Sequence, residues 1–161
     1  MLQQKYQLYV SGPLTNVPDE RRPEIKKFYE DLAEVFEATM RAHGFAEVLG
    51  YVPHRFTDPI LHVNLTPAEV VKIDKARFSE SSLMVMYTGL PAHGVGREHE
   101  WAISAGIPIV AVYERARFEA GQIGRISRVD VTAQIVFEDY ADALSQFRDW
   151  LETFYVPGIK K

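Results

Sequence analysis

The chain has 161 residues, 47% of them hydrophobic and 25% charged, which is the composition of one globular domain. A formal net charge of −4 gives no electrostatic reason to expect nucleic-acid polymers or anionic membranes as partners. The lack of cysteine excludes disulfides, thiolate catalysis and cysteine-ligated zinc. There is no signal-peptide pattern and no apolar run near the ~20 residues of a membrane span, so we expect a single domain over 1–161, located in the cytoplasm.

The first third of the chain alternates strand and helix signals. Residues 6–10 are a β-rich run that ends at a Ser-Gly-Pro turn, and we expect them to form the first, central strand. Apolar residues at helical spacing predict a helix over 23–42 that ends before Gly44. Residues 45–51 contain a short second strand. The segment 52–65 has little periodicity and is expected to be a long loop, a kind of segment that is often functional.

A capping box opens the next helix. The sequence Thr-Pro-Ala-Glu at 66–69 predicts a helix from Pro67 to about Glu80. Its buried face could be supplied by Val70, Ile73, Ala76 and Phe78. Asp74 interrupts this stretch, and a helical aspartate faces solvent by default. The apolar run 83–87 that follows is expected to be a buried strand.

The sequence Gly94-Val95-Gly96-Arg97-Glu98 joins that strand to a helix predicted over 98–105. This boundary places Glu98 in the first helical turn, where unpaired N–H groups favour an ionised carboxylate. The turn is not a dinucleotide fingerprint, because the third glycine is missing, and it is not a P-loop, because no Gly-Lys-Ser/Thr follows. A structural interpretation stays open, since Gly-rich turns and acidic first turns are common.

The rest of the chain continues the alternation. We expect a strand over 107–113, a loop or short irregular helix over 114–130, a strand over 131–137, and a last helix from Asp139 or Asp142 to Pro157-Gly158. Strands that alternate with helices imply a parallel sheet covered on both faces. The sequence therefore predicts an α/β, single-domain flavodoxin-like (Rossmann-like) fold, with a five-stranded parallel sheet in the order 2-1-3-4-5.

These segments resemble the nucleoside 2-deoxyribosyltransferases and the related deoxynucleoside monophosphate N-glycosidases. The run Tyr9-Val10-Ser11-Gly12-Pro13 is similar to the family's opening strand and loop, and Asp74 stands where the family has a sugar-binding aspartate. The run 94–98 matches the Gly-x-Gly-x-Glu turn that carries the nucleophile. Gly106-Ile107-Pro108 is similar to the family's helix end.

The resemblance implies roles for particular residues. Glu98 would be the catalytic nucleophile, with Asp74 and Tyr9 as its catalytic partners. It implies no cofactor and no metal, and a nucleoside or nucleotide as the small-molecule substrate. The candidate substrate-binding residues are Ser11, Gly12, His54, His93, Gly94, Gly96, Arg97 and Ser127.

The chemistry is also reasonable from first principles. Cleavage of an N-glycosidic bond leaves positive charge on the anomeric carbon, which a carboxylate can stabilise or attack. Water then gives hydrolysis, and a second base gives transfer. The histidines could be considered as metal ligands, but the spacing of His54, His62, His93 and His99 fits no known metal signature.

Two positions depart from the family pattern. Ala92 stands where the transferases have an aspartate and the monophosphate glycosidases have a serine that contacts phosphate. The phosphate-binding arginine of the glycosidase opening loop is also missing, and Thr15 lies near its place. The alternative to an enzyme is therefore a nucleotide-binding module of the same fold that has lost turnover, with a scaffold role as a weaker third hypothesis.

The resemblance also implies a homodimer or higher homo-oligomer whose pockets are shared. By position, the polar stretch Arg125-Ile126-Ser127-Arg128 resembles the segment that reaches into the partner's pocket in the glycosidase branch, which implies that Ser127 or Arg128 contacts the phosphate or sugar of a substrate held by the other subunit. Large apolar residues near the site could form the interface, or they could all pack within the monomer. These residues are Val70, Phe78, Trp101, Ile103 and Phe118.

Overall fold

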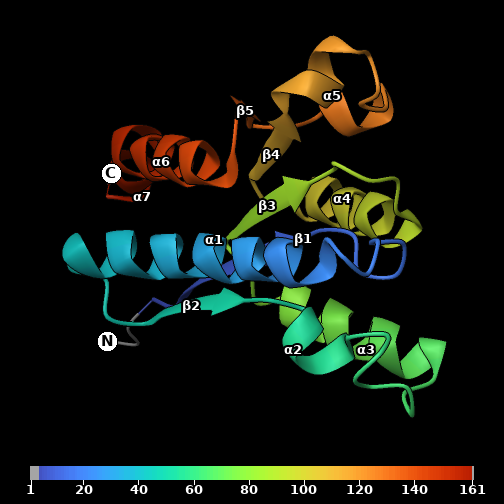
Figure 1. The fold of residues 1–161 in the computed structure, drawn as a ribbon. Helices are drawn as coiled ribbons and strands as arrows, with labels where there is room; N and C mark the ends of the chain where they lie inside the picture. Colours follow the sequence, from blue (N-terminus) through green and yellow to red (C-terminus); the bar gives the residue numbers. More distant parts are fainter. Residues whose placement is uncertain (1–3, 161) are drawn as a thin grey trace.

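The protein is described here by a computed structural model that covers residues 4–160. Its strands form one parallel sheet in the order β2-β1-β3-β4-β5 (Figure 1), which confirms the predicted flavodoxin-like fold and strand order. β1 is an interior strand that exchanges hydrogen bonds with both β2 and β3, whereas the middle strand of the sheet is β3 and not the first strand as expected. The strands are β1 (Tyr6–Ser11), β2 (Val48–Tyr51), β3 (Leu83–Tyr87), β4 (Ile109–Glu114) and β5 (Ala133–Phe137).

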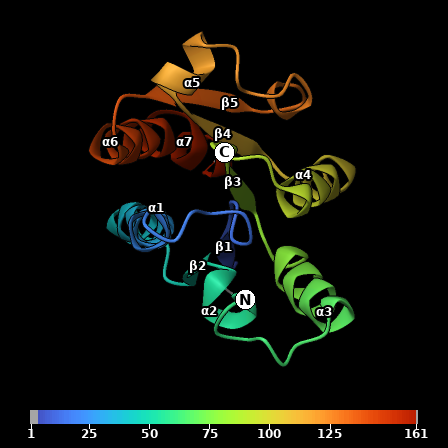
Figure 2. The ribbon, with the colours of Figure 1, turned by 45° about the vertical axis from the view of Figure 1, so that its right-hand side comes forward.

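Helices cover both faces of the sheet (Figure 2). On one face, α1 (Arg22–Ala42) and α6 (Tyr140–Trp150) pack side by side on a large apolar core. On the other face, α3 (Pro67–Phe78) and α4 (His93–Ala105) pack on a second, smaller core. Successive side chains of a strand point to opposite faces of the sheet. Leu8 of β1 therefore lies in the first core and Tyr9 in the second.

Local sequence signals account for several element ends. Thr66 and Glu69 form the predicted capping box at the start of α3, with each side chain bonded to the other residue's backbone N–H. Gly44 follows α1 with a φ of 90°, and Gly106 ends α4 with a φ of 66°. Glycine adopts this left-handed conformation without a steric penalty.

Two predictions for the middle of the chain are wrong. The segment expected to be a long loop contains a short helix, α2 (His54–Thr57). The helix expected to start at Glu98 starts at His93, after an extended Ala92. Gly94 and Gly96 therefore lie inside the first turns of α4. A helical glycine costs only about 1 kcal/mol relative to alanine, so the helix absorbs both.

The C-terminal end also differs from the expectation. The predicted irregular stretch after β4 holds α5 (Arg115–Glu119) and a 3₁₀ turn, η1 (Ile126–Arg128). Asp139 caps α6 as predicted, by accepting a hydrogen bond from the backbone N–H of Asp142. Pro157 and Gly158 do not end the helix. The chain continues through a π-helical segment, η2 (Leu151–Tyr155), into α7 (Val156–Ile159).

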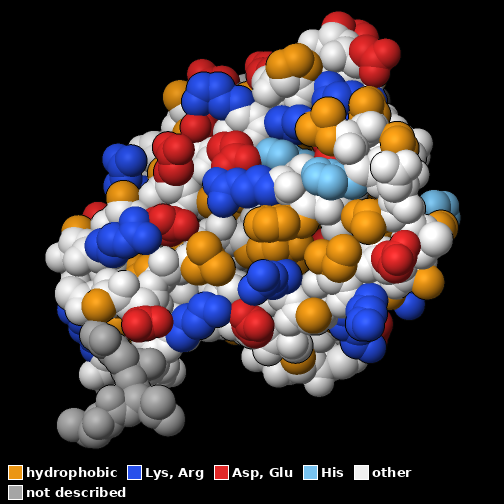
Figure 3. Space-filling model, turned by 90° about the horizontal axis from the view of Figure 1, so that it is seen from below, with side chains coloured by type: hydrophobic (Ala, Val, Ile, Leu, Met, Phe, Trp, Pro, Cys, Tyr) orange, Lys and Arg blue, Asp and Glu red, His pale blue; other side chains and the backbone are white. Residues whose placement is uncertain are grey.

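Several exposed hydrophobic side chains belong to α2 and to the segment between α2 and α3. Figure 1 shows these elements at the bottom of the molecule. The molecule seen from below has hydrophobic side chains among lysine, arginine and acidic residues (Figure 3). Phe56, Ile60, Leu61 and Val63 are each at least 45% exposed. Of the apolar residues considered for an interface, Phe78 is buried in the monomer and Ile103 is exposed. Within residues 4–160 no helix is both long and apolar enough to span a membrane.

Candidate functional site

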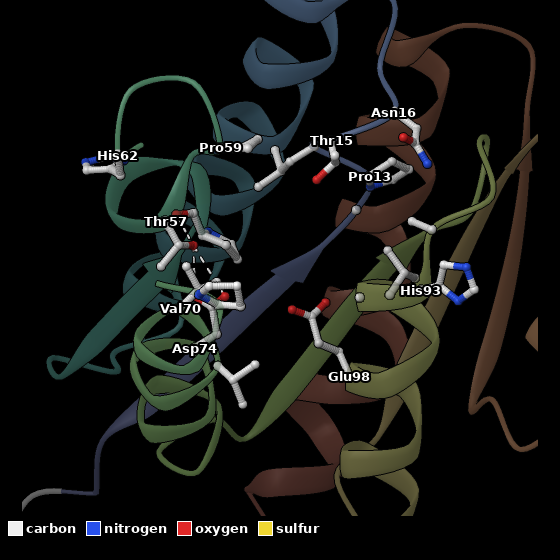
Figure 4. Close-up of a pocket in the computed structure, with 18 of the residues that line it drawn as sticks. Pro13, Thr15, Asn16, Thr57, Pro59, His62, Val70, Asp74, His93 and Glu98 are labelled. Atoms are coloured by element: carbon white, nitrogen blue, oxygen red, sulfur yellow. Dashed lines mark hydrogen bonds between the residues drawn. The ribbon is translucent and has the colours of Figure 1, made fainter. Parts of the chain in front are cut away.

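A cavity of about 660 Å³ opens at the carboxyl ends of β1 and β3 (Figure 4). This edge of a parallel sheet is where open α/β folds bind ligands. Three segments form the walls, namely the loop 12–16 after β1, residues 53–74 from α2 through α3, and the first turns of α4. The opening loop is held tightly, because Gly12 packs on the ring of Tyr29, which leaves no space for a Cβ atom.

Glu98 lies in this cavity, where its carboxylate accepts two hydrogen bonds from β1. The Tyr9 hydroxyl donates to Oε1 at 2.7 Å, and the Ser11 hydroxyl donates to Oε2 at 2.5 Å. Tyr9 and Ser11 are alternate residues of one strand, so both point to the face of the sheet that α4 covers. Both are fully buried, which fixes the orientation of the carboxylate.

Two expectations for Glu98 are wrong, namely that it lies in the first turn of its helix and that it stays ionised. α4 starts at His93, so Glu98 lies beyond the unpaired N–H groups of its first turn. Burial raises the pKa of Glu98 to about 7, against the lowering effect of the Ser11 and Tyr9 hydrogen bonds, and nearby Asp74 raises it further. Near pH 7 the group is therefore divided between its protonated and ionised forms.

Asp74 is the second carboxylate of the cavity, and it is only 8% exposed rather than solvent-facing. The Thr57 hydroxyl donates to its Oδ1 at 3.1 Å, and the Tyr51 hydroxyl donates at 3.3 Å. Burial raises the pKa of Asp74, and the two hydroxyls oppose that rise. In Figure 4 Asp74 and Glu98 face one another from α3 and α4 across the cavity.

The structure brings some of the predicted substrate-binding residues to the cavity and leaves others away from it. Gly12, His93 and Gly94 line it. Arg97 is exposed, with its guanidinium 5.5 Å from the centre of the Trp101 ring. His54 faces α1 instead, where its Nε2 lies 2.8 Å from Glu30 Oε1.

The remaining two predicted residues belong to a different cavity. Gly96 and Ser127 line a second, smaller cavity on the other side of α4. The Ser127 hydroxyl donates to the Gly124 carbonyl at 3.1 Å, and Arg128 lies over the ring of Phe118. The expectation that Ser127 and Arg128 enter a partner's pocket concerns a second chain and stays a prediction.

Several residues in or beside the cavity were not identified from the sequence. Thr57 and Tyr51 bind Asp74, although neither lies in a recognisable motif. The lack of periodicity in 52–65 was the signal, and this segment supplies much of one wall. The residues of that wall and the adjoining helix are Pro53, Thr57, Pro59, His62, Val63, Leu65, Pro67, Val70 and Val71.

A buried ion pair anchors this wall to the body of the fold. Lys26 of α1 binds the Asp58 side chain, which is fully buried and also accepts hydrogen bonds from the backbone N–H groups of Ile60 and Leu61. Burial by itself would raise the pKa of Asp58, but these donors outweigh it and hold the pKa at about 2. The segment that follows α2 is thereby fixed beside the cavity.

Comparisons with known proteins identify the fold. No protein-family model matches the chain, and no curated protein is significantly similar to it in sequence. A CMP N-glycosidase of Clostridium botulinum superposes with a TM-score of 0.62 at 17% identity, over 90% of this chain and 99% of that one. A conserved protein of Enterococcus faecalis superposes with a TM-score of 0.58 at 17% identity, over 90% of this chain and 98% of that one.

A third structure comes from the transferase branch. A 2-deoxyribosyltransferase of Bacillus psychrosaccharolyticus superposes with a TM-score of 0.54 at 17% identity, over 86% of this chain and 90% of that one. The chain has the fold of these proteins. The resemblance inferred from the sequence is therefore confirmed at the level of the fold. At this identity the chemistry of this chain depends on its own residues.

The cavity offers carboxylates and hydroxyls rather than a clustered set of metal ligands. Among residues 4–160 there is no group of three histidine, cysteine, aspartate or glutamate side chains placed to hold a metal ion. Its lining within the same residues includes His62 and His93 but no lysine or arginine. A pair of facing carboxylates in an apolar cavity can stabilise positive charge that develops on a bound sugar.

Proposed function

We propose that the protein cleaves the N-glycosidic bond of (deoxy)nucleosides or their 5′-monophosphates, with Glu98 as the nucleophile. The observation that carries this proposal is the Glu98 carboxylate, held by Tyr9 and Ser11 and facing the buried Asp74. A carboxylate fixed by two hydroxyl donors costs little reorganisation during the reaction. The fold shared with a CMP N-glycosidase and a 2-deoxyribosyltransferase supports it.

The proposed reaction has two steps. An ionised Glu98 oxygen attacks the anomeric carbon while the carbon–nitrogen bond breaks, which releases the base and leaves a glycosyl ester on Glu98. Water or a second base then attacks the same carbon and the ester carbon–oxygen bond to Glu98 breaks, which frees the carboxylate. The attacking group loses a proton to solvent, and the base released in the first step takes one up. Asp74 binds the sugar hydroxyls, because its buried carboxylate keeps acceptor capacity beyond its bonds to Thr57 and Tyr51.

The lining of the cavity bears on the substrate. A phosphate group is usually recognised by arginine, lysine or a helix N-terminus. The cavity lining among the described residues has the N-terminal turn of α4 but no basic side chain other than its histidines. We therefore propose that nucleosides are better substrates than their monophosphates.

A panel of nucleosides and 5′-monophosphates, incubated with and without a free acceptor base, tests the proposal. Chromatography would follow base release and the formation of new nucleosides. We expect wild-type protein to release base and Glu98→Ala to lose activity while it remains folded by circular dichroism. Near-wild-type rates in Glu98→Ala would remove Glu98 from its role.

Ala92 favours a second candidate function, a nucleotide-binding module without turnover. Ala92 lines the cavity, yet it has neither the carboxylate nor the hydroxyl that the family pattern places there. Equilibrium binding separates the two functions. A nucleoside that binds wild-type protein and is recovered intact after prolonged incubation would support the module and contradict the enzyme.

A further inference from the structure

A second cavity of about 300 Å³ lies beside the first. It is bounded by the loop after β3, by one side of α4, and by the turn around 122–127. The two cavities share Ala92 and Val95 as wall residues. The first turns of α4 thus stand between two chambers at the same edge of the sheet.

Two polar groups in this second cavity lack partners. His99 is 4% exposed, and its Nε2 is buried with no hydrogen-bond partner among the described residues. The Thr88 hydroxyl is buried and unpartnered in the same way. Both residues line the cavity. A buried polar atom without a partner costs roughly 1–3 kcal/mol, so a molecule in this cavity that formed hydrogen bonds with both groups would recover that cost.

The other lining residues define the class of that molecule. Within the described residues no acidic side chain, lysine or arginine lines the cavity, which disfavours an ionic ligand. The walls are otherwise mostly apolar, with Gln122 and Ser127 as further polar groups. The apolar residues are Met86, Leu90, Pro91, Ala92, Val95 and Ile126. A neutral, flat molecule with donors and acceptors on its edge and apolar faces fits this lining.

His99 links the second cavity to the candidate catalytic residue Glu98. His99 follows Glu98 directly, and one residue turns about 100° around a helix, so the two side chains leave α4 toward different chambers. We propose that the second cavity binds a free neutral nucleobase, which forms hydrogen bonds with His99 Nε2 and the Thr88 hydroxyl. The choice of a nucleobase among neutral heterocycles rests on the proposed function, in which a free base is product or acceptor.

Direct binding of free bases tests this site without any need for turnover. Cytosine, uracil, thymine, adenine and hypoxanthine would each be titrated into the full-length protein by calorimetry. We expect at least one base to bind, and to bind Glu98→Ala as tightly as wild type. Thr88→Val keeps the shape and removes the hydroxyl, so its affinity should fall roughly 3- to 10-fold, and His99→Leu should lose as much or more.

Matched controls separate this result from general effects on the fold. Thr153→Val and His43→Leu make the same chemical changes at exposed positions and should leave affinity unchanged. Thermal unfolding would show whether His99→Leu is folded, and Thr88→Val gives an independent answer if it is not. If no base binds, or if Thr88→Val and folded His99→Leu bind as wild type does, the chamber holds water only and the proposal is wrong.

The same measurements distinguish this inference from the proposed function. Wild-type protein that releases no base from any nucleoside, but binds a free base in a Thr88- and His99-dependent way, would contradict the glycosidase and keep the site. Base release that is unaffected by Thr88→Val, together with unchanged base affinity, would keep the glycosidase and overturn the site.

Discussion

Tyr9 and Glu98 stand 89 positions apart in the chain, yet the Tyr9 hydroxyl lies 2.7 Å from Glu98 Oε1 and donates a hydrogen bond to it. The contact joins β1 to α4. The hydroxyl stabilises the ionised carboxylate and so opposes the effect of burial on the pKa of Glu98. Burial, together with nearby Glu98, holds the pKa of Tyr9 well above its usual value, so the phenol remains a donor at neutral pH.

Tyr9→Phe is expected to raise the pKa of Glu98 above about 7, because one donor to its ionised form is lost. If Glu98 is the nucleophile, the rising limb of kcat/KM against pH should move to higher pH. Tyr6→Phe is the control, since Tyr6 lies on the same strand and packs on Phe45. An unchanged pH profile in Tyr9→Phe would show that the hydrogen bond does not tune Glu98.

Glu98→Gln is expected to stabilise the fold in a pH-dependent way. Burial raises the pKa of Glu98 from 4.5 to about 7, so ionisation is disfavoured in the folded state. This destabilisation is absent below pH 4.5, grows as pH rises, and is complete above pH 7. Urea unfolding should show Glu98→Gln more stable by on the order of 1–3 kcal/mol at pH 8, with the gap closing toward pH 4. Glu100→Gln, at an exposed position of α4, should show no pH-dependent gain in stability. A gain for Glu98→Gln that is equal at every pH would contradict the raised pKa of Glu98.

Asp74→Asn should weaken recognition of the sugar. The exchange keeps the shape, but the amide has one acceptor oxygen in place of two. We expect kcat/KM for a nucleoside to fall by roughly 10- to 100-fold, as after loss of a hydrogen bond to a charged group. For a substrate that lacks the bound sugar hydroxyl, kcat/KM should already be low with wild type. With Asp74→Asn it should fall little further. Additive losses would place Asp74 away from that hydroxyl, and Asp149→Asn on α6 serves as the surface control.

Lys26→Met should destabilise the protein, because it leaves the fully buried Asp58 without its cation. Loss of one partner of a buried pair costs about 3–5 kcal/mol. The neighbouring Lys27→Met removes an exposed pair with Asp31 and should cost less than about 1 kcal/mol. Hydrogen exchange at residues 59–63 should speed up in Lys26→Met alone, and equal exchange in both variants would show that the pair does not anchor the wall.

The same pair predicts how stability changes in acid. The pKa of Asp58 is lowered from 3.8 to about 2, so its stabilising effect is complete above pH 3.8 and is lost as pH falls through 2. Wild type should therefore lose stability over this interval. Lys26→Met should lose less there, since its Asp58 is no longer held ionised. Parallel acid-unfolding curves for the two proteins would contradict this account.

A shared active site would make the protein a homo-oligomer in which Ser127 or Arg128 completes a partner's pocket. Light scattering at micromolar concentration should then give a dimer or larger assembly, and a monomer would end the hypothesis. Glu98→Ala and the Ser127→Ala, Arg128→Ala double variant should each be inactive alone. Their mixture should regain activity. In a mixed dimer, one pocket combines the intact Glu98 of the double variant with the intact Ser127 and Arg128 of the Glu98→Ala chain.

The fold could be predicted almost completely from the sequence. Apolar runs and helical spacing gave the strands, and their alternation gave the sheet order that the structure has. The start of α4 could not be predicted, because glycine is a poor helix former whose cost is overridden by packing of Val95 and Ala102 on the sheet. Pro157 and Gly158 failed as stop signals for a similar reason, since Val156 is held in the first core.

The candidate site could be predicted only in part. Motifs pointed to Glu98, Tyr9 and Asp74, and the structure places them together. The burial of Asp74 depends on Thr57 and Tyr51, which reach it from distant positions and carry no local signal. The Lys26–Asp58 pair likewise joins α1 to the segment after α2, a tertiary contact that spacing cannot reveal.

The Lys26–Asp58 pair fixes the start of a cavity wall whose sequence can change without altering the residues that hold Glu98. Glu98, Tyr9 and Ser11 depend on β1 and α4, whereas residues 59–65 form a short irregular segment attached at Asp58. Loops accept insertions and exchanges far more readily than strands do. An exchange within residues 59–65 would therefore reshape one wall of the cavity while leaving the Glu98 carboxylate and its two hydroxyl donors in place.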